Sequence, residues 1–367
     1  MKNHIIPIGI RKSKTLYLVF TSLLLCSCNS EHIIDKLTMV LTASYDLNDN
    51  KIENNVLIGE YTEQDKTNII FRKTTSNNNY EIITHLNTQM NKPIAYGQMR
   101  MILFGQAFAR KGIGDVINIL SRDAEISSHL QLAVSSDKPE DIMRATIETH
   151  DPLYLMRMIE QNYINENLPN VNLHTHVFNY YGQGQDIYIP TFKLTPNESV
   201  EIDGIALFKK DKDVHHLSID ECIWLKLLLQ NAKSGTFAMT KEHNENILIH
   251  IDSSKNKMKL IQSNPQLIIQ DRLKINASIK NISEEIPIRK KQQLDELEKE
   301  LEEYVRNNIE KLTKKLQSLK VDPVGFGRFT RSRDRKWNEN EFYRQYDKQF
   351  TFNLDVEIKL NQIGTED

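Results

Sequence analysis

Phe350-Thr-Phe-Asn-Leu-Asp-Val-Glu-Ile-Lys-Leu360 alternates apolar with polar residues over eleven positions near the end of the chain. Successive side chains of a strand point to opposite faces, so this period predicts a half-buried β-strand. Residues 273–279 alternate in the same way. Between these two stretches, apolar residues recur at threes and fours and predict one long amphipathic helix over about residues 289–319. They are Leu294, Leu297, Leu301, Val305, Ile309, Leu312, Leu316 and Leu319.

Strands bracket this helix, so we expect it to pack on a sheet, with a free coiled coil as the alternative. The stretch Asp322-Pro-Val-Gly-Phe-Gly327 follows the helix. It predicts a helix stop and a tight turn into an extended segment. Gly325 and Gly327 would supply the backbone freedom for that turn.

The stretch before this region predicts a smaller set of elements that begins at a boundary near Thr195-Pro196-Asn197. Ser218 and Glu221 have the spacing of a capping box, in which each residue satisfies an amide of the helix start. The other elements expected here are a strand over 200–208, a charged turn over 209–213, a helix over 223–229 closed by Gly235, and a hairpin of strands 247–251 and 258–261 around Ser253–Asn256.

The first part of the chain predicts strands alternating with helices, which is typical of a mixed α/β or α+β domain. Gly182, Gly184 and Pro190 mark a loop near its end. The expected elements are a hairpin over 37–61 around Asp46–Asn50, a helix from Ser76–Asn79 to about Met90, strands over 100–104 and 130–134, and helices over 107–110 (ended by Gly112), 115–120 and from Pro139.

These patterns together predict an α+β fold of three mixed α/β domains, each a small sheet with helices packed on it. We expect the domains to span residues 28–195, 196–265 and 266–367, the last with the one long amphipathic helix. Residues 1–27 would form a signal peptide.

Composition places the chain of 367 residues in the soluble globular class, with 39% hydrophobic and 26% charged residues. Its formal net charge is −2. Loss of residues 1–27 would remove four positive charges and no acidic residue, which leaves about −6. Because a nucleic-acid-binding protein shows a basic excess or stripe, we expect no nucleic-acid partner.

The start of the chain has the layout of an export signal. A cationic segment precedes an apolar run, Leu16 to Leu25, which is too short to span a bilayer. Leu25-Cys26-Ser27-Cys28 then resembles a bacterial lipobox, with Cys28 as the modified residue. An ordinary cleaved signal or an uncleaved anchor is the alternative. A diacylglyceryl thioether and an amide-linked acyl chain on Cys28 would hold the protein stably at a membrane.

Candidate residues for chemistry are few. His174, His176, His215 and His216 could suggest a metal site, but they lack neighbouring cysteines or an HExxH arrangement. Neither Gly112-Ile-Gly114 nor Gly325-Phe-Gly327 continues as a phosphate-binding loop. With Cys26 removed and Cys28 lipidated, Cys222 would be the single free cysteine of the mature chain, and we expect it on an apolar helix face as an inert core thiol. We therefore expect no catalytic residue, no metal and no cofactor.

A basic cluster follows the long helix: Arg328, Arg331, Arg333, Arg335 and Lys336, with Phe329 and Trp337 at its edges. It predicts either a solvated loop that pairs with the acidic helix, or a contact to anionic lipid headgroups or to a membrane partner.

Several blocks, in order along the chain, resemble the Ger(x)C family, the lipoprotein C subunits of spore germinant receptors. The blocks are Ile102-Leu-Phe-Gly105 with Lys111-Gly112, Ser121-Arg-Asp-Ala-Glu-Ile126, Asp203-Gly-Ile-Ala-Leu-Phe208, Asp322-Pro-Val-Gly-Phe-Gly327, and Trp337. Ser127-Ser128 departs from the family, which often has a basic residue there.

The resemblance implies a non-enzymatic subunit needed for nutrient-triggered germination. Its partners would be the membrane A and B subunits, and its lipid on Cys28 (N-palmitoyl, S-diacylglycerol) would hold it on the outer face of the spore inner membrane. We do not expect it to bind a small-molecule germinant directly. The alternatives are an exported solute-binding lipoprotein, which should show two similar lobes, and an extracytoplasmic enzyme.

Overall fold

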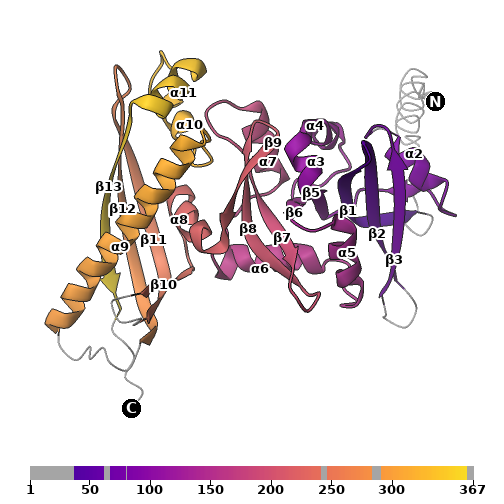
Figure 1. The fold of residues 1–367 in the computed structure, drawn as a ribbon, viewed down its shortest axis with the longest axis horizontal. Coiled ribbons are helices and arrows are strands. Elements are labelled where there is room, and N and C mark those ends of the chain that lie inside the picture. The colour runs from indigo at the N-terminus through magenta and orange to yellow at the C-terminus, as the bar shows by residue number, and fades with distance from the viewer. Residues whose placement is uncertain (1–36, 62–66, 80, 241–245, 283–290, 362–367) are drawn as a thin grey trace, which may run out of the picture. The chain divides into compact units, whose positions relative to one another are not determined.

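The computed structural model describes residues 37–61, 67–79, 81–240, 246–282 and 291–361. From Thr38 on, these residues belong to one compact unit. Their strands form a nine-stranded and a four-stranded sheet, and helices pack on both (Figure 1). The mixed α/β character predicted from the sequence is confirmed.

The nine-stranded sheet has the order β3-β2-β1-β5-β6-β7-β8-β9, with the short β4 beside β1. Pairs among β1, β5, β6 and β7 are parallel, and the pairs toward both ends of the sheet are antiparallel. The strands are β1 (Thr38–Asn48), β2 (Lys51–Tyr61), β3 (Thr67–Ser76), β4 (Ile94–Ala95), β5 (Met101–Gly105), β6 (Gln131–Ser135), β7 (Tyr188–Leu194), β8 (Val200–Lys209) and β9 (Lys212–Ser218).

The first hairpin is confirmed. Asn48 of β1 pairs with Lys51 of β2, so the connecting loop is Asp49-Asn50. Both loop residues have positive φ, 47° and 64°. That combination matches the right-handed twist of the strands, and Asp and Asn tolerate it better than most residues.

Helices cover both faces of this sheet. Alternate residues of β5 and β6 enter two different hydrophobic clusters: Met101, Leu103 and Ala133 enter one, and Phe104 and Val134 enter the other. The helices are α2 (Ile82–Asn87), α3 (Gln106–Lys111), α4 (Gly114–Arg122), α5 (Pro139–Ile147), α6 (Tyr154–Asn165) and α7 (Leu173–Tyr181). Gly112 ends α3 with a φ of 136°, and Pro139 opens α5, as predicted.

Two local expectations for this part differ from the structure, and two of its helices had no expectation from the sequence. β3 continues through Ser76, so α2 begins only at Ile82. Residues 154–165 and 173–181 form helices that no sequence signal indicated. Pro190 lies inside β7, opposite Ile205 of β8, and not in a loop. Pro190 lies outside the two residues of β7 that pair with β6, Thr191 and Phe192, and next to the register shift between them, and a bulge is one of the places where a strand accepts proline.

The four-stranded sheet has the order β10-β11-β12-β13, with β12 and β13 parallel. Its strands are β10 (Thr236–Thr240), β11 (Asn246–Gln262), β12 (Leu267–Ile282) and β13 (Phe350–Leu360). The helices of this half are α8 (Ile219–Leu229), α9 (Lys291–Ser318), α10 (Phe326–Arg331) and α11 (Glu339–Lys348). The capping box of Ser218 and Glu221 opens α8 as predicted, but Gln230 rather than Gly235 ends it.

The expected hairpin around Ser253–Asn256 is wrong, because β11 runs unbroken through it. The pairing register with β12 shifts between Ile251 and Ser253. The turn-forming side chains find long-range partners: Ser254 Oγ accepts from Ala232 N, and Asn256 Nδ2 donates to Leu228 O. These contacts hold the polar residues in an extended strand.

The long helix α9 lies across one face of the four-stranded sheet (Figure 1). Leu301, Val305, Ile309 and Leu316 have no exposed surface and join the same core as the sheet residues Leu273, Ile275 and Val356. A helix packed on a sheet is therefore confirmed over a free coiled coil.

Strand pairing crosses both proposed domain boundaries. β7 and β8 flank residue 195 and are antiparallel neighbours in the first sheet. β11 and β12 flank residue 265 and are neighbours in the second sheet. Residues 196–265 thus contribute strands to two sheets and do not form a third sheet of their own. The division at residues 195 and 265 stays a prediction, and it must accommodate these pairings.

Candidate functional site

The segment Asp322–Gly327 is built around one buried carboxylate. Asp322 has no exposed surface. Its Oδ1 accepts from the amides of Gly325 and Phe326 at 2.8 and 3.0 Å, and its Oδ2 accepts from Gly327 N at 2.8 Å. The first amides of a helix have no partner within the helix, and the carboxylate supplies one. The segment therefore turns into α10, and the extended continuation expected from the sequence is wrong.

A second loop, Gly184–Asp186, closes on this segment. Asp186 N donates to Asp322 O at 2.9 Å, and Asp322 N donates to Asp186 Oδ2 at 2.7 Å. Gln185 Nε2 donates to Pro323 O at 2.8 Å, and Arg328 N donates to Gly184 O at 2.6 Å. We call these contacts the Asp186–Asp322 junction. It ties the loop before β7 of the first sheet to the start of α10.

Two glycines allow this close approach. A Cβ on Gly327 would lie 2.8 Å from Gly184 Cα and 2.9 Å from Phe342 Cε1. Gly184 has a φ of 84°, and a Cβ there would lie 2.5 Å from Arg328 N. Real Cβ atoms do not come this near to backbone atoms. The Gly-Phe-Gly pattern is thus explained by packing of one loop on another.

Two further side chains contact the junction at Asp186, namely Lys209 of β8 and Tyr343 of α11. Lys209 Nζ lies 3.2 Å from Asp186 Oδ2, and the Tyr343 hydroxyl donates to the same oxygen at 3.2 Å. The ammonium of Lys209 also lies 3.6 Å from the ring centroid of Tyr343. The pKa of Asp322 is raised to about 7, chiefly by burial and to a smaller extent by the neighbouring Asp186, against the lowering effect of the three amides. Both carboxylates point at donors of the junction itself, so the arrangement holds two loops together and presents no free base to a substrate.

Outside the junction, α10 and the following loop carry the basic cluster. Arg328 lies 5.8 Å from the ring centroid of Phe178 on α7, Arg331 lies 5.9 Å from that of Trp337, and Arg333 lies 3.7 Å from that of Phe329. Phe178 is 55% exposed. Within the described ranges, no ion pair joins the cluster to a carboxylate of α9. The guanidinium groups of these three arginines therefore lie near aromatic rings, which orders them at the surface.

The predicted histidines do not come together. His174 is exposed on α7, whereas His176, on the same helix, has no exposed surface. Burial lowers the pKa of His176 to about 3, so its ring is neutral. On β9, His216 Nε2 lies 3.1 Å from Thr191 Oγ1 and 3.3 Å from Asp203 Oδ2. In the part of the chain that the structure describes, no three His, Cys, Asp or Glu residues are placed to hold a metal ion.

Two buried reactive groups lie in α8. Cys222 has no exposed surface, its thiol donates to Ser218 O, and burial raises its pKa well above the ordinary value. Lys226 is 1% exposed and donates to the carbonyls of Tyr163 and Glu166. Burial lowers the pKa of Lys226 to about 8. Both groups are engaged by backbone carbonyls inside the core, where no substrate reaches them.

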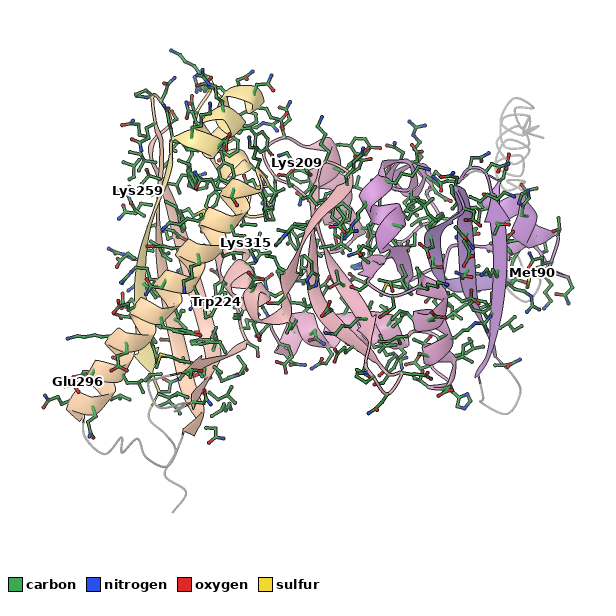
Figure 2. The ribbon with its side chains drawn as sticks, in the orientation of Figure 1. Met90, Lys209, Trp224, Lys259, Glu296 and Lys315 are labelled. Atoms are coloured by element: carbon green, nitrogen blue, oxygen red, sulfur yellow. The ribbon has the colours of Figure 1, made fainter. Side chains whose placement is uncertain are left out.

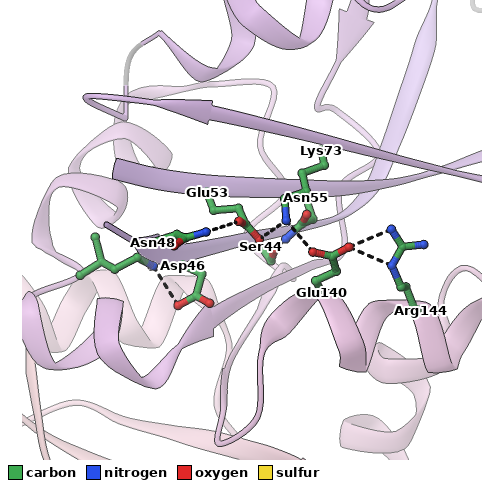
Figure 3. Close-up of polar contacts among 9 residues, drawn as sticks. Ser44, Asp46, Asn48, Glu53, Asn55, Lys73, Glu140 and Arg144 are labelled. Atoms are coloured by element: carbon green, nitrogen blue, oxygen red, sulfur yellow. Dashed lines mark hydrogen bonds and ion pairs between the residues drawn. The ribbon is translucent and has the colours of Figure 1, made fainter. Parts of the chain in front are cut away.

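A charged cluster on the first sheet was not singled out from the sequence (Figure 3). Lys73 Nζ lies 2.9 Å from Glu53 Oε1 and 2.6 Å from Glu140 Oε2, and Arg144 lies 2.8 Å from Glu140 Oε1. Beneath them, the buried Asn55 donates to Ser44 Oγ at 3.0 Å. Each charge is compensated within the cluster, which joins α5 to β2 and β3. Like the Asp186–Asp322 junction, it depends on residues far apart in sequence.

The predicted lipid-attachment residue, Cys28, lies outside the described residues. Within those residues, no helix has the length and apolar character needed to cross a bilayer.

Both halves of the chain match models of known protein families. Residues 30–194 match the model of the spore germination protein N-terminal domain, and residues 203–364 match that of the spore germination B3/GerAC-like C-terminal domain. The chain belongs to the GerAC-like family of spore germination proteins. The family resemblance drawn from the sequence blocks is thereby confirmed.

Individual relatives agree with this family. The spore germination protein GerQC of Bacillus cereus is 24% identical over 354 residues, which are 95% of this chain and 98% of GerQC. The putative spore germination protein YfkR of Bacillus subtilis (strain 168) is 22% identical over 249 residues, 66% of this chain and 64% of YfkR. The crystal structure of the GerBC protein matches 84% of this chain and 97% of its own, with a TM-score of 0.58 and 17% identity, and so shares the fold.

Proposed function

We propose that this GerAC-like protein is a lipid-anchored subunit of a spore germinant receptor and acts by assembly with membrane A and B subunits. The observation that carries the proposal is the family match across both halves of the chain. The Asp186–Asp322 junction supports the non-enzymatic part of the proposal, because the buried residues of the Asp322–Gly327 block serve to join two loops. A non-enzymatic role fits the buried Asp322, Cys222 and Lys226, which are engaged in structural contacts.

The anchor is the first part of the proposal. Cys28 would carry the N-palmitoyl and S-diacylglycerol chains and hold the protein on the outer face of the spore inner membrane. Two or more acyl chains give stable anchoring, whereas one gives only marginal binding. In metabolic acyl labelling, Cys28→Ala should abolish the label and Cys26→Ser should keep it. Label that survives Cys28→Ala would refute the anchor.

Assembly is the second part. A tethered protein meets its membrane partners at a high effective concentration, so weak contacts suffice. Deletion of the gene should block germination by particular nutrients and leave germination by non-nutrient triggers intact. Single Ala variants of His174, His176, His216 and Cys222 should change the response only through stability. A variant that folds at normal level yet abolishes the response would require an active site instead.

An exported solute-binding lipoprotein is the alternative. Such proteins place a cleft between two similar lobes, but the two sheets here differ in strand number and order. That difference favours the receptor subunit. Titration of the purified protein with candidate small molecules separates the two functions, because a solute-binding protein should show saturable binding without any partner.

A further inference from the structure

The uncovered face of the four-stranded sheet is strongly basic. Strand register aligns four successive rows across β11, β12 and β13. The rows are Lys259–Gln270–Asn353, Lys257–Arg272–Asp355, Lys255–Lys274–Glu357 and Ser253–Asn276–Lys359. These twelve positions hold six cations and two carboxylates, on a chain whose formal net charge is −2. We call them the lysine face.

The orientation of the lysine face follows from alternation along β11. Lys255, Lys257 and Lys259 are exposed, whereas Met258 and Leu260 between and beside them pack against the main core. Figure 2 shows Lys259 on the side of the sheet away from α9. The lysine face is therefore the surface that α9 leaves open.

The placement of these cations lowers the stability of the sheet. Lys255 lies directly opposite Lys274, and Lys257 directly opposite Arg272. Like charges in opposed positions of neighbouring strands are destabilising. Arg272 and Lys274 have counter-ions on β13, at 3.1 Å to Asp355 and 2.6 Å to Glu357. The three β11 lysines have no ion pair with any carboxylate that the structure describes, so their charge is left for an external anion.

The lysine face also contains a cavity. The cavity, of about 330 Å³, lies over the lower rows of the face, and Lys255, Lys274 and Lys359 line it together with Ser253 and Asn276. Glu357 also lines it, but its carboxylate is paired with Lys274, so Lys255 and Lys359 leave the cavity with a net positive charge. Ammonium, hydroxyl and amide groups are all hydrogen-bond donors to phosphate oxygens. The cavity therefore suits a phosphate group presented from outside.

We propose that the lysine face docks on a bilayer through the phosphate groups of anionic lipids. Lysine is depleted in protein–protein interfaces, where aromatic residues and Arg are enriched. Its hydrated, flexible ammonium suits mobile headgroups that present no fixed geometry. A second copy of this chain would set one lysine face against another, which like charges oppose. The inference extends the proposed function, because a lipid-anchored protein stands beside such a bilayer.

Binding to lipid vesicles tests the docking proposal on protein that lacks the lipid anchor. Residues 29–367, which contain the whole compact unit from Thr38 on, are sedimented with vesicles of phosphatidylcholine alone or mixed with phosphatidylglycerol. We expect binding to the anionic vesicles only, weakening as salt is added. Lys255→Gln/Lys257→Gln/Lys259→Gln should weaken it about a hundredfold, since each cation near an anionic surface contributes on the order of a factor of five.

The matched control removes the same charge from the opposite side of the sheet, with Lys299→Gln/Lys311→Gln/Lys314→Gln on α9, and should bind as the parent does. The triple variant of β11 should unfold at the same or a higher temperature than the parent, because opposed cations are removed; a fall would point to a structural role and refute the proposal. Equal binding by parent and variant, or equal loss in both triple variants, would also overturn it. Saturable binding to an acidic protein with none to anionic vesicles would assign the face to a protein partner instead. These results do not depend on Cys28, so failure here and failure of the lipid anchor are distinguishable.

Discussion

Replacement of Asp271 by Asn should make the stability of the protein less sensitive to pH. Asp271 lies in β12 on the core side of the sheet and has no exposed surface. Its Oδ1 accepts from Lys257 N at 3.0 Å, while Oδ2 has no hydrogen-bond partner among the described residues. Burial raises the pKa of this carboxyl from 3.8 to about 6, against the lowering effect of two backbone amides.

The size of the effect follows from that shift. The folded chain keeps the proton of Asp271 up to about pH 6, whereas the unfolded chain loses it near pH 3.8. The contribution of this group to stability is therefore complete below pH 3.8 and is lost as the pH rises through about 6. A shift of about two pKa units corresponds to about 3 kcal/mol in the free energy of unfolding. Asp271→Asn removes this loss.

Asn keeps an acceptor for Lys257 N but places an amide nitrogen where Oδ2 lies. At pH 4 the protonated carboxyl of the parent already carries one O–H, so Asn adds one buried donor, and this should make the variant less stable than the parent by about 1–3 kcal/mol. Between pH 4 and pH 7 its relative stability should rise by about 3 kcal/mol.

Urea unfolding at several pH values, followed by tryptophan fluorescence and circular dichroism, measures this difference. Asp355→Asn is the control, because Asp355 is an exposed carboxylate on the neighbouring strand and its surface ion pair with Arg272 contributes little. If the parent and Asp271→Asn lose stability in parallel from pH 4 to pH 7, Asp271 ionises normally in the folded chain and the reasoning is wrong.

Two further predictions concern packing. Gly327→Ala should lower the free energy of unfolding by about 1–3 kcal/mol, because the new Cβ meets Gly184 and the two loops must separate. Gly97→Ala is the control, because its Cβ would have only Glu125 O nearby, at 3.7 Å, and thermal unfolding should be nearly unchanged. Similar losses in both variants would argue against the junction. Leu301→Ala should lower the free energy of unfolding, measured with denaturant, by about 2–5 kcal/mol, because it opens a cavity beneath α9. Asn307→Ala, at an exposed position of the same helix, should change it little. An unchanged midpoint for Leu301→Ala would mean that α9 does not depend on the sheet.

The candidate site shows where reasoning from sequence stops. The pattern Asp322-x-x-Gly-Phe-Gly indicated a helix stop and a turn, and Gly184 indicated only a loop. Asp186, which receives donors from Asp322, Tyr343 and Lys209, carried no sequence signal. An isolated Asp can cap a helix or form a turn, and only a partner more than a hundred residues away decides that it is buried.

The sequence by itself determined β13, α9 and the first hairpin, because their signals are local. Eleven alternating residues, eight apolar residues at helical spacing and an Asp-Asn turn each favour one backbone conformation without help from the rest of the chain.

Only the tertiary structure decided the course of β11 and the joining of β7 to β8. Ser253–Asn256 has turn-forming side chains, but Ala232 and Leu228 supply their hydrogen bonds and β12 supplies the ladder, so the strand continues. Strand pairing links residues across an apparent boundary, and its free energy depends on a neighbouring strand that composition and periodicity within one segment do not specify.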